Sequence, residues 1–88
     1  MQIAFLPGET NDTTLWMVWV CAVVNGHRVR CGMSYQALRT HFGADWENPM
    51  PAFVTHRRQI EQIFTTFIQQ HRMEDDMTLV VRAHDLAG

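Results

Sequence analysis

The 88-residue chain contains no lysine, and all seven of its basic residues are arginines. A chain without lysine cannot form a Schiff base with a carbonyl substrate or supply the lysine of a phosphate-binding loop. The formal net charge of −2 also speaks against dedicated binding to nucleic acid or to an anionic membrane. These absences remove several classes of enzyme and of surface-binding protein.

Cysteine and long apolar runs are also scarce. Cys21 and Cys31 are too few for a disulfide scaffold. The longest apolar run, Leu15 to Val24, is about half the length that a membrane helix needs. The N-terminus has neither the basic flank nor the apolar stretch of a signal peptide. We therefore expect one domain spanning residues 1–88, a cytoplasmic location with reduced thiols, and no membrane association.

Apolar periodicity and turn residues divide the chain into four strands and two helices. Ser34 is a typical helix N-cap and Gly43 a typical C-terminal stop, so we expect a short helix between them. Pro51 suits the first turn of a longer helix, which ends at about Arg72. The strands are expected at residues 2–6, 14–24, 27–33 and 77–83, with a loop at 7–13. The order β-β-β-α-α-β predicts an α+β fold: a mostly antiparallel four-stranded sheet with one short and one long helix packed on one face.

The Asn25-Gly26 pair predicts a type I′ turn between the second and third strands. A two-residue turn fixes the register, so that Val20 faces Cys31. One face of this hairpin then carries Trp16, Val18, Val20, Ala22, Val24, Val29, Cys31 and Met33, which we expect to lie under the long helix together with Leu79 and Val81. Cys21 and Cys31 point to opposite faces, so we expect no disulfide between them.

The opposite face of the hairpin is the candidate functional surface. It carries Met17, Trp19, Cys21 and Val23 beside Arg28 and Arg30. Both helices are expected on the other side, and monomers rarely expose apolar patches larger than roughly a few hundred Å². Met, Trp and Arg are also enriched at protein interfaces. We expect this face to bind another chain, either itself in a homodimer or another protein; the alternative is that the first strand or the 7–13 loop folds over it.

Residue types that often carry catalysis are present but isolated. The five histidines include no pair at the i, i+4 spacing of a helical zinc site, and there is no Cys-x-x-Cys. Cys31 lies on the apolar face, where a thiol is a small inert side chain, and Ser34 is used as a helix cap. The acidic run Glu74-Asp75-Asp76 falls in a turn, which favours a solvated loop. We expect no metal and no cofactor, and we assign no catalytic residue.

Two other functions stay open beside a non-enzymatic interaction module. Arginines beside a sheet tryptophan are typical of a stacking platform for single-stranded nucleic acid, which would suit a nucleic-acid-linked regulatory protein. The residues concerned are Arg28, Arg30, Arg57 and Arg58. The second alternative is a small enzyme with a cleft near Tyr35, His41 and Trp46, although these residues include no complete set of nucleophile, base and oxyanion donor.

The order and spacing of several short motifs resemble one known family. The segment Asn25-Gly26-His27-Arg28-Val29-Arg30-Cys31, followed by Ser34, Ala37-Leu38 and His41-Phe42-Gly43-Ala44, resembles the small bacterial domain-of-unknown-function family 1488. The later pattern is similar too: Phe53, Arg57 or Arg58, Ile60, Glu74-Asp75-Asp76 and Leu79-Val80-Val81. The resemblance implies an α+β fold in a bacterial cytoplasmic protein. It implies no activity and no site residues.

Overall fold

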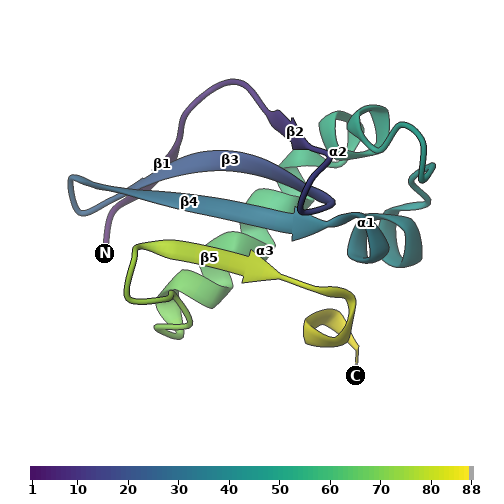
Figure 1. Cartoon of the computed structure of the whole chain (residues 1–88). Coiled ribbons are helices and arrows are strands. Elements are labelled where there is room, and N and C mark those ends of the chain that lie inside the picture. Colours follow the sequence, from purple (N-terminus) through teal and green to yellow (C-terminus); the bar gives the residue numbers. More distant parts are fainter. Residues whose placement is uncertain (88) are drawn as a thin grey trace.

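The structure is a computed structural model that describes residues 1–87 (Figure 1). Its centre is the hairpin of β3 (Met17–Val24) and β4 (His27–Ser34). Asn25 and Gly26 have φ angles of 51° and 86°, as a type I′ turn requires. Val20 pairs with Cys31, so the predicted register is confirmed.

Three further strands complete a five-stranded sheet around this hairpin. β1 (Ile3–Phe5) and β2 (Thr10–Asp12) both pair antiparallel with β3, and β5 (Thr78–Val81) pairs parallel with β4. A short 3-10 helix, η1 (Ala83–Leu86), follows β5. The fold is α+β, as predicted, but the loop expected at 7–13 contains β2. The longer β3 extends beyond the short β1, so its remaining backbone groups need another partner, and β2 supplies it.

The first helix, α1 (Tyr35–Phe42), lies where the sequence predicts it. The Ser34 hydroxyl accepts a hydrogen bond from the Ala37 N–H at 3.1 Å, which satisfies a free donor of the first turn. Gly43 ends the helix in the left-handed conformation, with φ of 68°. Local capping chemistry thus fixes both ends of α1.

The long helix expected from Pro51 onwards is instead two helices. α2 (Met50–Thr55) and α3 (Arg57–Gln69) meet at His56. Val54 and Thr55 are β-branched and have reduced helix propensity, which favours an interruption of the helix at this point. α3 lies across one face of the sheet, while α1 and α2 lie at one end (Figure 1). Within residues 1–87, no helix has the length and apolar character needed to cross a membrane.

The core lies between α3 and the sheet. The face predicted to be buried is buried from Val18 onwards, and Leu79 and Val81 join it as expected. Trp16 is the exception, because the β3–β4 ladder begins at Met17. Trp16 has a φ of 57°, which is unusual for a bulky residue, and its side chain is 56% exposed. The prediction that Trp16 belongs to the core face is therefore wrong.

β5 forms one edge of the sheet, and local contacts occupy both of its ends. The Glu74 N–H donates to the Thr78 carbonyl at 2.7 Å. Beyond the other end, the Asp85 carboxylate accepts from the Arg82 N–H at 2.8 Å and forms an ion pair with Arg72 at 3.0 Å. These contacts tie the last strand to the turns on either side of it.

Candidate functional site

The face of the sheet that points away from α3, here called the outer face, holds the interface residues predicted from the sequence. It is turned toward the viewer in Figure 1. It comprises Met17, Trp19, Cys21, Val23, Arg28 and Arg30, joined by Thr78 and Val80 of β5. The pairing of β3 with β4 thus brings all six predicted residues onto one surface.

The apolar part of the outer face is better covered than the sequence predicts. Met17 and Trp19 are only 2% and 7% exposed, whereas Cys21 is half-buried. The Trp19 ring lies against Gly32, where an added Cβ would come within 2.7 Å of it. The Arg30 guanidinium lies 4.4 Å from the ring centre. The expectation of an uncovered face is wrong at Trp19, because the glycine lets the indole approach the sheet and the arginine covers it.

Asp12, at the end of β2, holds both the turn that follows it and the Trp19 ring. One carboxylate oxygen accepts from the backbone N–H groups of Thr14 and Leu15, each at 3.0 Å. The other accepts from the Trp19 indole N–H at 3.2 Å. The pKa of Asp12 is lowered, above all by the hydrogen bond from Leu15, with partial burial opposing and the Trp19 and Thr14 bonds and the Arg30 charge assisting. Asp12 is therefore best stabilised as the carboxylate.

Replacing Asp12 with asparagine should remove part of the protein's sensitivity to acid. Because folding lowers the pKa of Asp12 below its ordinary value of 3.8, its stabilising effect is present above that value and is lost as the pH falls through the folded pKa. The melting temperature of Asp12→Asn should lie below that of wild type at pH 7, and the difference should shrink as the pH falls below 3.8. A difference that stays constant over this range would contradict the prediction.

The turn after Asp12 places Trp16 in an aromatic cluster with Tyr35 and Trp46, at the end of the sheet where α1 begins. The Trp16 ring centre lies 6.0 Å from that of Tyr35 and 5.4 Å from that of Trp46. The Tyr35 hydroxyl donates to the Asn11 side chain, and the Tyr35 N–H donates to the Trp16 carbonyl at 2.9 Å. These contacts fix the left-handed turn, so the exposed indole is held in one place.

Three hollows adjoin one another, from the end of the sheet beside α1 onto the outer face. The first, here called the aromatic pocket, has a volume of about 310 Å³ and is walled by the Trp16 cluster. The second, of about 330 Å³, shares Leu15 and Arg82 with the first. The third, of about 320 Å³, shares Trp19 and Arg30 with the second and reaches the loop between β1 and β2. Neighbouring hollows share lining residues, so they adjoin one another, and the three together are here called the groove.

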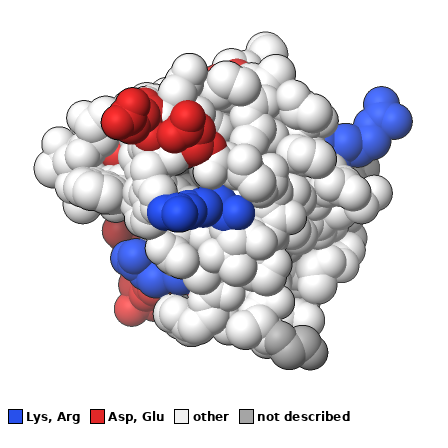
Figure 2. Space-filling model, turned by 90° about the vertical axis from the view of Figure 1, so that its right-hand side faces the viewer, with Lys and Arg blue, Asp and Glu red and all other residues white. Residues whose placement is uncertain are grey.

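Charged side chains are sparse on the adjoining end of the molecule. Figure 2 views the end at which α1 and α2 lie, and most of this surface is uncharged, with a few acidic and basic groups close to one another. The Arg39 guanidinium belongs to this region and lies 5.6 Å from the centre of the Trp46 ring.

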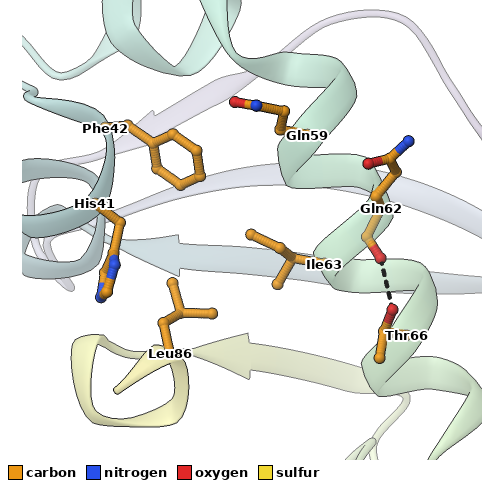
Figure 3. Close-up of a pocket in the computed structure, with 7 residues that line it drawn as sticks. All are labelled: His41, Phe42, Gln59, Gln62, Ile63, Thr66 and Leu86. Atoms are coloured by element: carbon orange, nitrogen blue, oxygen red, sulfur yellow. Dashed lines mark hydrogen bonds between the residues drawn. The ribbon is translucent and has the colours of Figure 1, made fainter. Parts of the chain in front are cut away.

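A separate pocket of about 560 Å³ lies on the helical side of the molecule (Figure 3). Phe42, Ile63 and Leu86 point toward its centre from α1, α3 and η1. Its other lining residues are His41, Gln59, Gln62 and Thr66, and the Thr66 hydroxyl donates to the Gln62 carbonyl. The lining carries no carboxylate and no guanidinium, so the pocket offers only neutral hydrogen-bonding groups and an imidazole.

The structure brings together only two of the three residues of the predicted enzyme cleft. Tyr35 and Trp46 lie 6.3 Å apart and line the aromatic pocket, whereas His41 lines the pocket between α1 and α3. Cys31 is buried in the core, and desolvation raises the pKa of its thiol to about 12. Within residues 1–87, no group of three histidine, cysteine or acidic side chains could hold a metal ion.

The four arginines proposed for nucleic acid do not share one surface. Arg28 and Arg30 lie on the outer face, whereas Arg57 begins α3 on the opposite side. The Arg57 side chain forms ion pairs with Glu9 at 2.5 Å and Glu61 at 2.7 Å. Partial burial lowers the pKa of Arg57, and the bonds to the two glutamates outweigh it, so the net change is upward. The Arg57 guanidinium is thus already bound to carboxylates of the same chain and is not free to bind a phosphate.

Comparison with known proteins assigns the chain to a family. The model of a family described as a protein of unknown function, DUF1488, matches residues 3–81. The chain belongs to the DUF1488 family. A crystal structure of a DUF1488 protein of unknown function from Shewanella loihica PV-4 is similar, with a TM-score of 0.78, 21% identity and 90% of each chain covered. At this identity the likeness shows the DUF1488 fold alone. No curated protein matches the chain.

For this DUF1488 chain, the sequence reasoning missed Leu15 and Trp16 as surface residues. Both were assigned to a continuous strand, yet they are 60% and 56% exposed. The signal available was Asn11-Asp12 ahead of two threonines, since an Asp side chain that accepts from the N–H groups two and three residues later forms a turn. Arg82 lines two of the hollows, and no pattern in the neighbouring sequence predicts this position.

Proposed function

We propose that the chain is a non-enzymatic protein-interaction module that binds a second copy of itself or another protein through the outer face. The observation that carries the proposal is the exposure of Leu15 and Trp16 beside the groove along the sheet. Large apolar side chains next to a hollow are typical anchors of protein interfaces, and tryptophan is among the commonest of them.

Arg28 and Arg30 supply the charge on the same face. Both are exposed, and within residues 1–87 neither forms an ion pair. Guanidinium groups at the rim of an interface orient the partner and raise the rate of association more than they add affinity. We therefore propose that Leu15 and Trp16 supply most of the binding affinity and that the two arginines orient the partner.

We also propose a bacterial, cytoplasmic setting in which both thiols stay reduced. Cys21 and Cys31 are free cysteines on opposite faces of the hairpin, so neither needs an oxidising compartment. The solved DUF1488 relative comes from Shewanella loihica PV-4, which agrees with this setting.

The test compares Trp16→Ala with Val54→Ala, since Val54 is equally exposed but lies on α2. Sedimentation equilibrium over a range of concentrations detects self-association, and affinity capture with quantitative mass spectrometry detects other partners. We expect Val54→Ala to match wild type and Trp16→Ala to lose the dimer or the captured proteins. Equal association by all three proteins, or none by any of them in either assay, would refute the proposal.

A further inference from the structure

At the aromatic pocket, the Trp16 ring presents aromatic surface that is open to solvent. Trp16, Tyr35 and Trp46 lie with their ring centres 5.4 to 6.3 Å apart, so they pack on one another as a wall. Tyr35 is buried and Trp46 half-buried, but Trp16 leaves 56% of its surface to solvent. The outer surface of this wall is therefore available to a further ring.

Backbone geometry holds Trp16 in this exposed position. Its φ of 57° is unfavourable for a large side chain, and such conformations persist where surrounding contacts impose them, often at binding sites. Here Asp12 fixes the preceding turn and the Tyr35 N–H holds the Trp16 carbonyl. The chain thus accepts a strained residue and an exposed indole at the same point.

The charge at the pocket favours an anion. Arg82 and His84 line it, and its lining includes no carboxylate. Within residues 1–87, Arg82 forms no ion pair. The nearby Asp85 carboxylate is bound to Arg72 and to the Arg82 N–H, and it lies 3.5 Å from His84. The Arg82 guanidinium is therefore the group left to receive a negative charge.

The groove continues beyond the pocket, which favours a chain over a small molecule. The second hollow shares Leu15 and Arg82 with the aromatic pocket and adds about 330 Å³. The lining of this second hollow includes Glu74 and Asp76, which would repel an anionic group. Such a group therefore fits beside Arg82 in the aromatic pocket and not in the second hollow. A bound segment would place its ring and its acid together at one end of the groove.

We infer that the aromatic pocket receives an aromatic side chain of a partner protein whose neighbouring residue is acidic. The ring stacks on Trp16, and the carboxylate forms a charge-assisted pair with Arg82. The inference rests on the proposed function, since it names the chemistry of the partner that the outer face would bind.

The test uses short peptides and NMR of the ¹⁵N-labelled protein. Acetyl-Gly-Asp-Trp-Gly-amide should shift the signals of Trp16, Trp46 and Arg82 in a saturable way. Peptides with Asn for Asp, or Leu for Trp, should bind about tenfold more weakly, as expected for one lost charge-assisted bond or one lost stacking contact. Arg82→Gln should bind the Asp peptide about tenfold more weakly and the Asn peptide unchanged.

Several outcomes would overturn the inference. One is equal binding of the Asp and Asn peptides; another is shifts confined to the pocket of His41 and Ile63. Binding of N-acetyl-tryptophan as tightly as the peptide would mark a site for small aromatic acids instead. If no peptide binds while partner capture still depends on Trp16, this inference fails and the proposed function stands. If the Asp peptide binds at Arg82 but capture and self-association do not depend on Trp16, the proposed function fails.

Discussion

Trp19→Ala is expected to lower the free energy of unfolding by about 3–5 kcal/mol. Trp19 is 7% exposed, lies against Gly32 and under Arg30, and donates its indole N–H to Asp12. Truncation opens a cavity on the outer face and leaves the Asp12 carboxylate without one of its donors. Urea unfolding followed by far-UV circular dichroism measures the loss, because that signal comes mainly from the backbone and not from the tryptophan removed.

Trp16→Ala is the matched control for this prediction. Trp16 lies in the turn just before β3, the strand that holds Trp19, but it is 56% exposed, so its removal should cost less than about 1.5 kcal/mol. The two variants also separate roles, since Trp16→Ala should affect binding and Trp19→Ala should affect folding first. Equal destabilisation by both substitutions would show that the burial of Trp19 does not set its contribution.

Arg57→Ala is expected to cost about 2–3 kcal/mol of folding free energy. The Arg57 guanidinium donates to the Leu6 carbonyl at 2.5 Å and the Gly8 carbonyl at 3.2 Å, in addition to its two ion pairs with Glu9 and Glu61. One side chain thus joins the start of α3 to the loop between β1 and β2. Urea unfolding gives the total effect, and hydrogen exchange should show faster opening of that loop.

Arg58→Ala provides the control, because Arg58 is the exposed neighbour and forms no ion pair within residues 1–87. We expect it to change stability by less than about 0.5 kcal/mol. Arg57→Lys keeps the charge but lacks the planar fork that reaches several acceptors, so it should recover only part of the loss. Full recovery by lysine would mean that charge alone, and not the set of hydrogen bonds, holds the loop.

The parts of the fold that local chemistry dictates could be predicted from the sequence. Asn25-Gly26 specifies a turn that few other pairs accommodate, and the turn then sets every pairing of β3 with β4. Ser34 and Gly43 mark the ends of α1 for the same reason, since each satisfies backbone groups within a few residues. The core face, and the opposite orientations of Cys21 and Cys31, follow from that register.

The parts that depend on distant contacts could not be predicted. β2 forms because β3 needs a pairing partner beyond the end of β1. The Arg57 side chain reaches its acceptors in the loop between β1 and β2 only once α3 lies over the sheet. Trp19 is buried because Gly32 of the next strand leaves room for its ring and Arg30 of the same strand covers it. The alternation of apolar and polar residues in the sequence does not predict these two contacts. The sequence predicts a cleft with Tyr35 and Trp46, but not that Trp16 and Arg82 also line it, because these residues come from segments far apart in the sequence.

The parallel pairing of β5 with β4 has a consequence for how the protein is made. A ribosome delivers the β3–β4 hairpin early, and its local contacts can form at once. β4 then keeps an open edge until the last strand emerges, and the core lacks Leu79 and Val81 for the same time. A chain halted before Thr78 would carry an unpaired strand over an incomplete core, which is the kind of species that chaperones bind and that aggregates when they do not.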